Sequence, residues 1–437
     1  MNKIKMSLVA AIAAAAATTG ANAGALDSIL SNPKLDIELR PRYESVDDDV
    51  HKDASALTVR TAIGVQTGLF EVDGLNAQLQ AMSVDHFGLV TDYNPEDARY
   101  ATVADPAQTR MTQANISYAS NGFIGIVGRK MVVLDNARFI GNVGWRQMPQ
   151  TYDLAAAIYN GVENLSLLGA YVTRVNQIGK DANFQTGTVL LHAAYKVMPE
   201  LTLTAYDYMV QNFADHIGIR ATGNFDLYGV KLGYEAEYAT QEDPSLTDDD
   251  ETNHIPTRKD PDDIEQDADY YKVALSGTMK GFTLGAAYEF LSDAGDGDAP
   301  FMTPLATLHA MNGWADKFLA TPSGGLTDIS VKAAYDAKEY GKLAVIYHDF
   351  GTDSDMPTAL NGTAASDDLG SEVDVAYNYK INKSLGLLLK GAWYSEGDVK
   401  GVRADTNNDG NVDTYKPIYH DTTKYWVQLD YKFHAEM

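Results

Sequence analysis

The sequence predicts an all-β fold, namely a transmembrane antiparallel up-and-down β-barrel of about 18 strands with long external loops and short periplasmic turns. Three observations predict it. Apolar and polar residues alternate along most of the chain, and a period of two is typical of strands with one apolar face. The gaps between these segments are long and short in turn. The chain also begins with a secretory signal pattern.

The signal pattern occupies residues 1–23. Lys3 and Lys5 precede an apolar, alanine-rich run, and Ala21-Asn22-Ala23 has the small residues of a cleavage site. We therefore expect a cleaved signal peptide over 1–23 and one barrel domain over 24–437. The expected location is the outer membrane of a Gram-negative bacterium.

Composition narrows the class further. The chain has no cysteine, which excludes disulfides, thiol catalysis and thiolate metal sites. Its net charge of −26 argues against nucleic acid as a partner. Tyrosine is abundant, with 26 residues against 13 Phe and 4 Trp, and its polar tip suits a membrane interface. After residue 23 no apolar run approaches the roughly 20 residues of a membrane helix, so a spanning chain must be a closed barrel.

The alternating segments are clear in individual cases. Leu35, Ile37 and Leu39 share one parity, whereas Asp36 and Glu38 share the other. Several apolar faces begin or end in tyrosine, as an aromatic girdle would. The predicted strands are 35–43, 55–67, 74–86, 111–119, 123–131, 151–160, 163–174, 187–197, 200–211, 214–222, 226–240, 269–279, 281–292, 327–336, 341–349, 371–380, 384–396 and 423–433.

Connection length indicates which end of the barrel is which. The predicted external loops include 87–110, 132–150, 241–268 and 293–326, and only the connection near Phe213 is short. The predicted periplasmic turns include Asn121-Gly122, Lys280 and a turn at 223–225. This alternation is typical of outer-membrane barrels.

One stretch carries a family resemblance. Residues 134–147 read LDNARFIGNVGWRQ, and QTYD follows at 150–153. With the early Arg40-Pro41-Arg42-Tyr43-Glu44 and Thr58-Val59-Arg60-Thr61, this pattern resembles the alginate-export family of outer-membrane porins over roughly residues 35–180. The resemblance implies an eighteen-stranded barrel. It also implies that export of an anionic polysaccharide through an arginine-lined pore is an alternative function.

Arginine is concentrated in the first 174 residues. Arg40, Arg42, Arg60 and Arg174 fall on the polar parity of their strands, and the parity of Arg129 is weak. Residues 132–150, with Arg138 and Arg146, form a loop long enough to fold inward. The predicted pore-lining and constriction residues are Arg40, Arg42, Arg60, Arg129, Arg138, Arg146 and Arg174, together with the acids Glu235, Glu237, Asp336, Glu372 and Asp374.

Two interpretations of these charges stay open. Arginines on one wall and carboxylates on the other would create a transverse field that orients solutes and selects them by charge. Alternatively the charges pair locally and only stiffen the wall.

The segment 405–413 reads DTNNDGNVD, like the start of an EF-hand loop. Asp405, Asn407, Asp409 and Asp413 would be ligands of a structural Ca²⁺ ion in an external loop. Lys416 stands where the bidentate Glu is required, so a turn that binds nothing is the competing interpretation. No other cofactor is expected.

The predicted function is a porin that forms a water-filled channel for passive diffusion of small polar or anionic solutes. The expected partners are outer-membrane lipids and lipopolysaccharide, small solutes and further copies in a homotrimer. The acidic loops are either simply solvated or bridged to anionic lipids by divalent cations. No hydrolase or phosphate-binding motif is present, so an outer-membrane hydrolase and an adhesin are the weaker alternatives.

Overall fold

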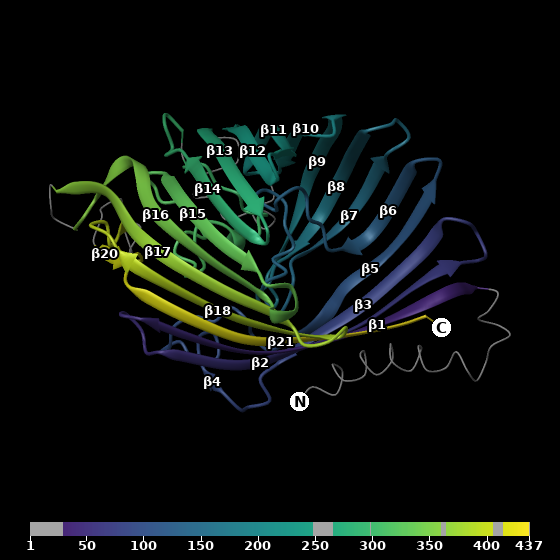
Figure 1. The fold of residues 1–437 in the computed structure, drawn as a ribbon, viewed down its shortest axis with the longest axis horizontal. Helices are drawn as coiled ribbons and strands as arrows, with labels where there is room; N and C mark the ends of the chain where they lie inside the picture. The colour runs from purple at the N-terminus through teal and green to yellow at the C-terminus, as the bar shows by residue number, and fades with distance from the viewer. Residues whose placement is uncertain (1–28, 248–264, 298, 360–363, 405–413, 437) are drawn as a thin grey trace.

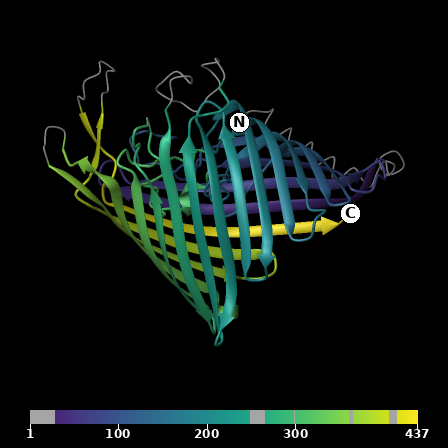
Figure 2. The ribbon, with the colours of Figure 1, turned by 90° about the horizontal axis from the view of Figure 1, so that it is seen from above.

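The computed structural model describes residues 29–247, 265–297, 299–359, 364–404 and 414–436. Eighteen antiparallel strands form a barrel that closes where the first and last strands pair, from Lys34 opposite Glu436 to Asp48 opposite Thr422 (Figures 1 and 2). The strands are β1 (Leu30–Asp48), β2 (Ala54–Leu69), β3 (Leu75–Asp85), β5 (Gln108–Ser120), β6 (Phe123–Lys130), β7 (Thr151–Tyr159), β8 (Leu165–Asn176), β9 (Asn183–Met198), β10 (Leu201–Val210), β11 (Ala214–Leu227), β12 (Val230–Glu242), β13 (Asp267–Met279), β14 (Phe282–Leu291), β15 (Leu326–Asp336), β16 (Lys342–Pro357), β17 (Ala365–Lys380), β18 (Leu385–Glu396) and β21 (Thr422–Glu436).

The predicted fold class is confirmed, and each predicted strand overlaps one barrel strand. Three short strands in long connections were not predicted: β4 (Thr91–Asp92), which adds to β2, and the pair β19 (Gly401–Ala404) and β20 (Thr414–Pro417). Two 3₁₀ turns, η3 (Leu308–Ala310) and η4 (Lys338–Tyr340), complete the described elements. Among the described residues no helix is long and apolar enough to cross a membrane.

One predicted turn is displaced. The sequence suggested 223–225, but β11 and β12 run on to pair Leu227 with Val230. The turn consists of Tyr228 and Gly229, whose φ angles are both positive, at 50° and 81° respectively. Two successive positive φ angles are the geometry of a tight type I′ hairpin, and Asn121-Gly122 has the same geometry where the sequence predicted it.

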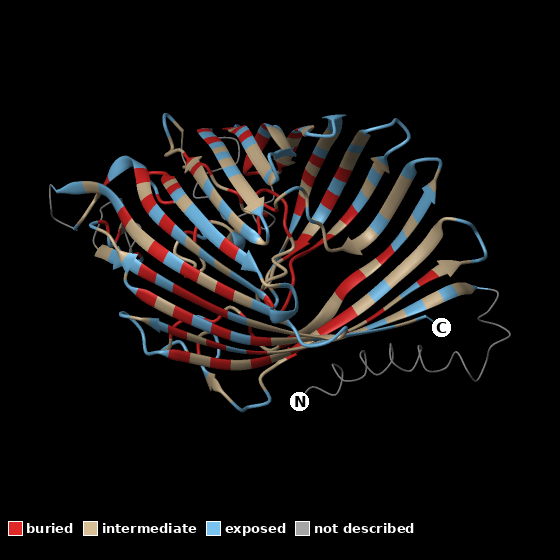
Figure 3. Ribbon diagram, viewed as in Figure 1, coloured by how far each residue is buried: buried red, intermediate tan, exposed pale blue. Residues whose placement is uncertain are grey.

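The two faces of the barrel differ in chemistry. Along each strand, well-exposed positions alternate with covered ones (Figure 3). The exposed positions are mainly apolar, including Val127, Ile219, Leu275 and Leu284. Aromatic residues lie toward both ends of this outer face, for example Tyr238, Tyr271, Tyr347 and Tyr425 at the loop end and Tyr159, Phe282, Tyr335 and Phe433 at the turn end. An apolar band between two aromatic girdles is the surface of a protein embedded in a bilayer.

Two sequence predictions lie outside the described residues. These are the signal peptide over 1–23 and the EF-hand-like segment with Asp405, Asn407, Asp409 and Asp413.

Candidate functional site: a lumen crossed by an inward-folded loop

Two long connections fold into the barrel. They are residues 131–150, between β6 and β7, and residues 292–325, between β14 and β15 (Figure 1). They bind each other through Gly141 N–H to Leu305 O at 2.9 Å and Thr307 N–H to Ala137 O at 3.0 Å. Tyr152 on β7 donates its hydroxyl to Gly141 O at 2.8 Å. The two loops therefore form one unit fixed to the barrel wall.

Gly141 is required at the contact between the loops. A Cβ atom there would lie 2.2 Å from Thr307 Oγ1 and 2.7 Å from the Thr307 nitrogen. Because the nitrogen is backbone, the clash could not be relieved by a side-chain rotation alone. The absence of a side chain at Gly141 thus permits the close approach of the two loops.

Loop 131–150 crosses the lumen from one wall to the other. Near its start, Asp135 lies 3.4 Å from Arg220 of β11, and Asn136 donates to Glu235 of β12 at 2.9 Å. Near its end, Gly144 accepts a hydrogen bond from Arg40 of β1 at 3.1 Å. The loop therefore bridges walls that are distant in the sequence.

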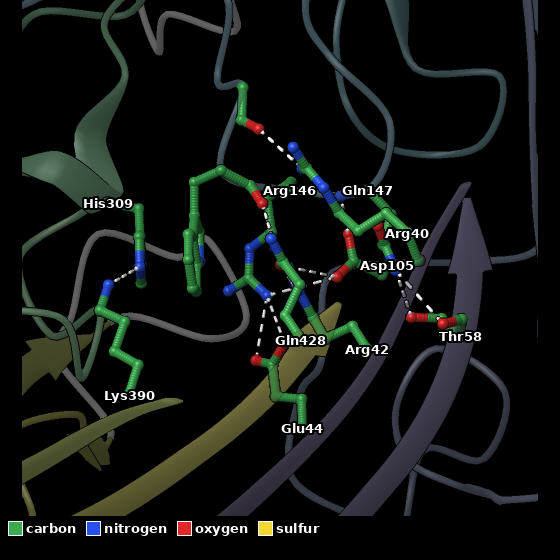
Figure 4. Close-up of polar contacts among 12 residues, drawn as sticks. Arg40, Arg42, Glu44, Thr58, Asp105, Arg146, Gln147, His309, Lys390 and Gln428 are labelled. Atoms are coloured by element: carbon green, nitrogen blue, oxygen red, sulfur yellow. Dashed lines mark hydrogen bonds and ion pairs between the residues drawn. The ribbon is translucent and has the colours of Figure 1, made fainter. Parts of the chain in front are cut away.

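The end of the loop enters a set of ion pairs that we call the arginine cluster (Figure 4). Arg146 lies 3.0 Å from Glu44 and 2.8 Å from Asp316, and Arg42 lies 3.3 Å from Asp105. The other pairs are Arg40 with Asp430 at 2.7 Å and Arg60 with Glu38. The cluster is defined by the cations Arg40, Arg42, Arg60 and Arg146 and the carboxylates Glu38, Glu44, Asp105, Asp316 and Asp430.

Electrostatics favours the ionised forms in the loop part of the cluster. Although burial opposes ionisation of Asp316, the charges of Lys424 and Arg146 and a hydrogen bond from His309 hold the pKa of its carboxyl well below the ordinary value. Burial also opposes the charge of Arg146, yet Glu44, Asp316 and Asp105 raise the pKa of its guanidinium. Each buried charge is thus stabilised by opposite charges rather than by water.

A lysine lies in an aromatic cage beside the cluster. The Lys390 Nζ atom is 3.6 Å from the ring centre of Trp314 and 4.0 Å from that of Trp145. His309 lies 2.8 Å from the same Nζ and 2.5 Å from Asp316. Burial lowers the pKa of His309 well below its ordinary value, so the neutral ring accepts from Lys390 and donates to Asp316. Cation–π contact replaces a carboxylate partner for Lys390.

The opposite wall is acidic. Glu289 pairs with Arg138 of the loop at 3.3 Å, and Glu237 accepts from Tyr206 at 2.9 Å. Glu372 accepts the backbone N–H groups of Trp314 and Ala315 at 2.5 and 2.7 Å, which holds the second loop. Asp374, Glu372, Asp328 and Glu289 are all buried on neighbouring strands β14–β17.

The structure brings together most of the predicted charges. Arg40, Arg42, Arg60 and Arg146 meet in the arginine cluster, and Arg138, Glu235, Glu237, Glu372 and Asp374 lie on or against the acidic wall. Asp336 lies apart, at the turn end of β15 opposite Lys342. Both interpretations of the charges find support, since cations and acids face each other across the lumen and each set is also paired locally.

Arg129 and Arg174 are placed on the outer face. Arg129 follows the exposed Val127 by two residues and pairs with Asp153 at 2.6 Å. Arg174 is in register with the same Asp153, because a β-bulge between Val172 and Arg174 shifts the parity of β8. The bulge explains why strict alternation placed Arg174 in the lumen.

Sequence reasoning missed several residues in and beside the arginine cluster. Asp105 and Asp316 come from loops without periodicity, so no pattern indicates where they lie. Lys390 and Lys424 lie on predicted strands, and Lys424 pairs with Asp316 at 2.8 Å. Their inward parity on these strands was the signal that could have identified them.

Comparisons with known proteins support the fold. No family model matches the chain, and no curated protein does. Among solved structures, OccAB2 of Acinetobacter baumannii is similar with a TM-score of 0.67 and 16% identity, over 93% of this chain and 99% of that one. OpdK of Pseudomonas aeruginosa, solved with vanillate, has a TM-score of 0.68 and 12% identity, over 93% and 100%. OccK5 (OpdH) of the same organism has a TM-score of 0.64 and 12% identity, over 92% and 98%.

These findings correct the family resemblance drawn from residues 134–153. The similar structures are Occ and Opd outer-membrane porins with eighteen-stranded barrels, and the alginate-export assignment is wrong. The physical reason lies in what the motif does. Residues 134–147 pack an inward loop against arginines of the wall, a task that a barrel of another family can share.

Proposed function

We propose that the chain is an outer-membrane porin through which small polar or anionic solutes diffuse passively. The observation that carries the proposal is the loop that crosses the lumen of a closed, lipid-facing barrel and ends among arginines. The lumen of the barrel provides the path for the solute, and the loop narrows this lumen at the point where charges lie closest to a solute. Cleavage of residues 1–23 during export is part of this proposal.

The charges that border the solute path suit a carboxylate. Arg40 has the most exposed side chain of the four arginines in the arginine cluster, at 12%, whereas the side chain of Arg42 is wholly covered. A guanidinium can hold a carboxylate through two parallel hydrogen bonds. Across the lumen, Glu235 is the more exposed acid, at 21% against 1% for Glu237. A solute would therefore meet Arg40 and its partner Asp430, which is 26% exposed, on one side and Glu235 on the other. The guanidinium of Arg40 is the group among these that can bind a carboxylate.

The vanillate in the OpdK structure supports the same solute class, because vanillate is an aromatic carboxylate. The proposal includes no enzymatic step. Export of an anionic polysaccharide rested on the alginate-export resemblance and loses its support with it.

Ion selectivity in planar bilayers tests this proposal. We expect conductance without added energy, and uptake of benzoate-type carboxylates into liposomes faster than uptake of the matching amides. Arg40→Gln should shift the reversal potential in a salt gradient toward cation preference, and Glu235→Gln should shift it in the opposite direction. Arg40→Lys is the charge-matched control. Shifts of the same sign in both neutralised variants would contradict the transverse arrangement.

A further inference from the structure

The charges on the outer face of the barrel are unevenly distributed near the loop end. The acids on outward strand positions there include Asp47, Asp85, Asp153, Asp207, Asp215, Glu242, Asp267, Asp269 and Asp349. Among the described strands, the cations on outward positions at this end are Arg129 and Arg174. Both lie on the adjoining strands β6–β8, which gives one sector of an acidic rim a positive charge.

The register fixes the orientation of these arginines. Val127 is 65% exposed and Tyr171 is 51% exposed, and both stand opposite the same outward-facing residue of β7. Arg129 and Arg174 both stand opposite Asp153 in the next outward row toward the loops. Arg129 is bound by Asp153 through two hydrogen bonds. Arg174 has no described carboxylate within ion-pair distance, so the group of three carries a net positive charge.

An apolar groove runs along the barrel wall below these arginines. Its volume is about 770 Å³. The floor is formed by small residues of three strands, and the sides by larger apolar ones; the lining includes Gly125, Ala155, Ala157, Gly169, Val127 and Tyr171. The wall is hollow here because small side chains stand where other strands carry larger apolar ones, as Ile219 and Leu275 show.

We propose that this sector binds one lipopolysaccharide molecule of the outer leaflet, with an acyl chain in the groove and a lipid A phosphate at Arg174 and Arg129. The two parts are arranged as such a lipid requires, because the cations lie one row of residues closer to the external surface than the groove. A phosphate oxygen accepts charge-assisted hydrogen bonds from a guanidinium. The acidic remainder of the rim would repel the same phosphate, so the charge difference directs the lipid to this sector. The inference rests on the membrane placement in the proposed function but not on conduction.

Lipid binding to the full barrel in nanodiscs tests the inference. Native mass spectrometry would count the lipids retained by the wild type from lipopolysaccharide, from the same lipopolysaccharide after phosphatase treatment, and from phosphatidylglycerol. Arg174→Gln should weaken retention of phosphorylated lipopolysaccharide about tenfold, the value of one charge-assisted contact. Gly169→Leu, which meets only Leu191 Cδ2 at 3.8 Å, should weaken it by filling the groove.

Arg99→Gln is the matched control, because Arg99 is an exposed arginine in an external loop that pairs with Asp97. It removes the same charge outside the sector and should leave retention unchanged. A heat-modifiable gel band and wild-type conductance would establish that each variant is folded. Equal retention in Arg174→Gln and the wild type would overturn the proposal. So would equal binding of phosphatidylglycerol or dephosphorylated lipopolysaccharide, or a second copy of the chain occupying the groove. A closed channel that still retains lipopolysaccharide would contradict only the proposed function.

Discussion

Replacing Arg146 with glutamine removes the cation that ties the inward loop to the barrel wall. Arg146 is 4% exposed, and its partners Glu44 and Asp316 lie at 3.0 and 2.8 Å. Breaking a buried pair from one side costs about 3–5 kcal/mol, because the other charge is left without compensation. That loss corresponds to a change of about 10²–10⁴-fold in the ratio of seated to released loop.

The barrel itself should survive this change. The strand ladder and the apolar outer face do not depend on Arg146, so we expect Arg146→Gln to give a folded band on gels. Release of loop 131–150 should raise single-channel conductance and current noise. Loss of the positive charge should move the reversal potential toward cation preference.

A double-mutant cycle separates the pair from the rest of the cluster. Glu44→Gln combined with Arg146→Gln removes both charges, so the double variant should recover part of the loss of the single arginine variant. Asp316 retains Lys424 at 2.8 Å and His309 at 2.5 Å in both cases. Wild-type conductance, noise and selectivity in Arg146→Gln would refute the role of Arg146 in holding the loop.

Three further predictions follow from other contacts. Burial lowers the pKa of Lys317 to about 8, so the unfolded chain binds more protons between about pH 8 and 10.5 and this residue's contribution to stability rises with pH in that window. In the channel, deprotonation of Lys317 should shift the reversal potential toward cation preference between pH 7 and pH 9. If a Lys317→Met variant shows the same pH-dependent shift, the attribution of the shift to Lys317 is wrong. Gly141→Val should separate the two inward loops at Thr307 and increase current noise, whereas noise equal to the wild type would show that the contact is dispensable. Ile219→Arg should destabilise the barrel in lipid by about 2–4 kcal/mol, measured by urea unfolding in vesicles, and the lumen-facing control Thr222→Arg should not; equal losses would contradict the assignment of faces.

The strands could be predicted from the sequence because local chemistry specifies them. Alternation across a bilayer is enforced at every residue, and turns such as Asn121-Gly122 have a distinctive chemistry. The boundary at 223–225 failed because apolar alternation continues through Phe225 and Leu227, whereas the turn itself depends on Tyr228 and Gly229.

The candidate site could be predicted only in part. The arginines of β1 and β2 were identified from parity, and the inward folding of 132–150 from loop length. Asp105 and Asp316 reach the cluster through the packing of loops, which no periodic pattern reports. Arg174 shows the opposite limit, because one bulge residue reverses the face of the positions that follow it.

The central claim is that a loop crossing the lumen narrows a passive channel between the arginine cluster and the acidic wall. The direct measurement is the reversal potential of purified protein in a planar bilayer under a salt gradient, for the wild type, Arg40→Gln and Glu235→Gln. The account predicts an open channel and shifts of opposite sign in the two variants. A closed channel, or identical reversal potentials in all three proteins, would contradict it.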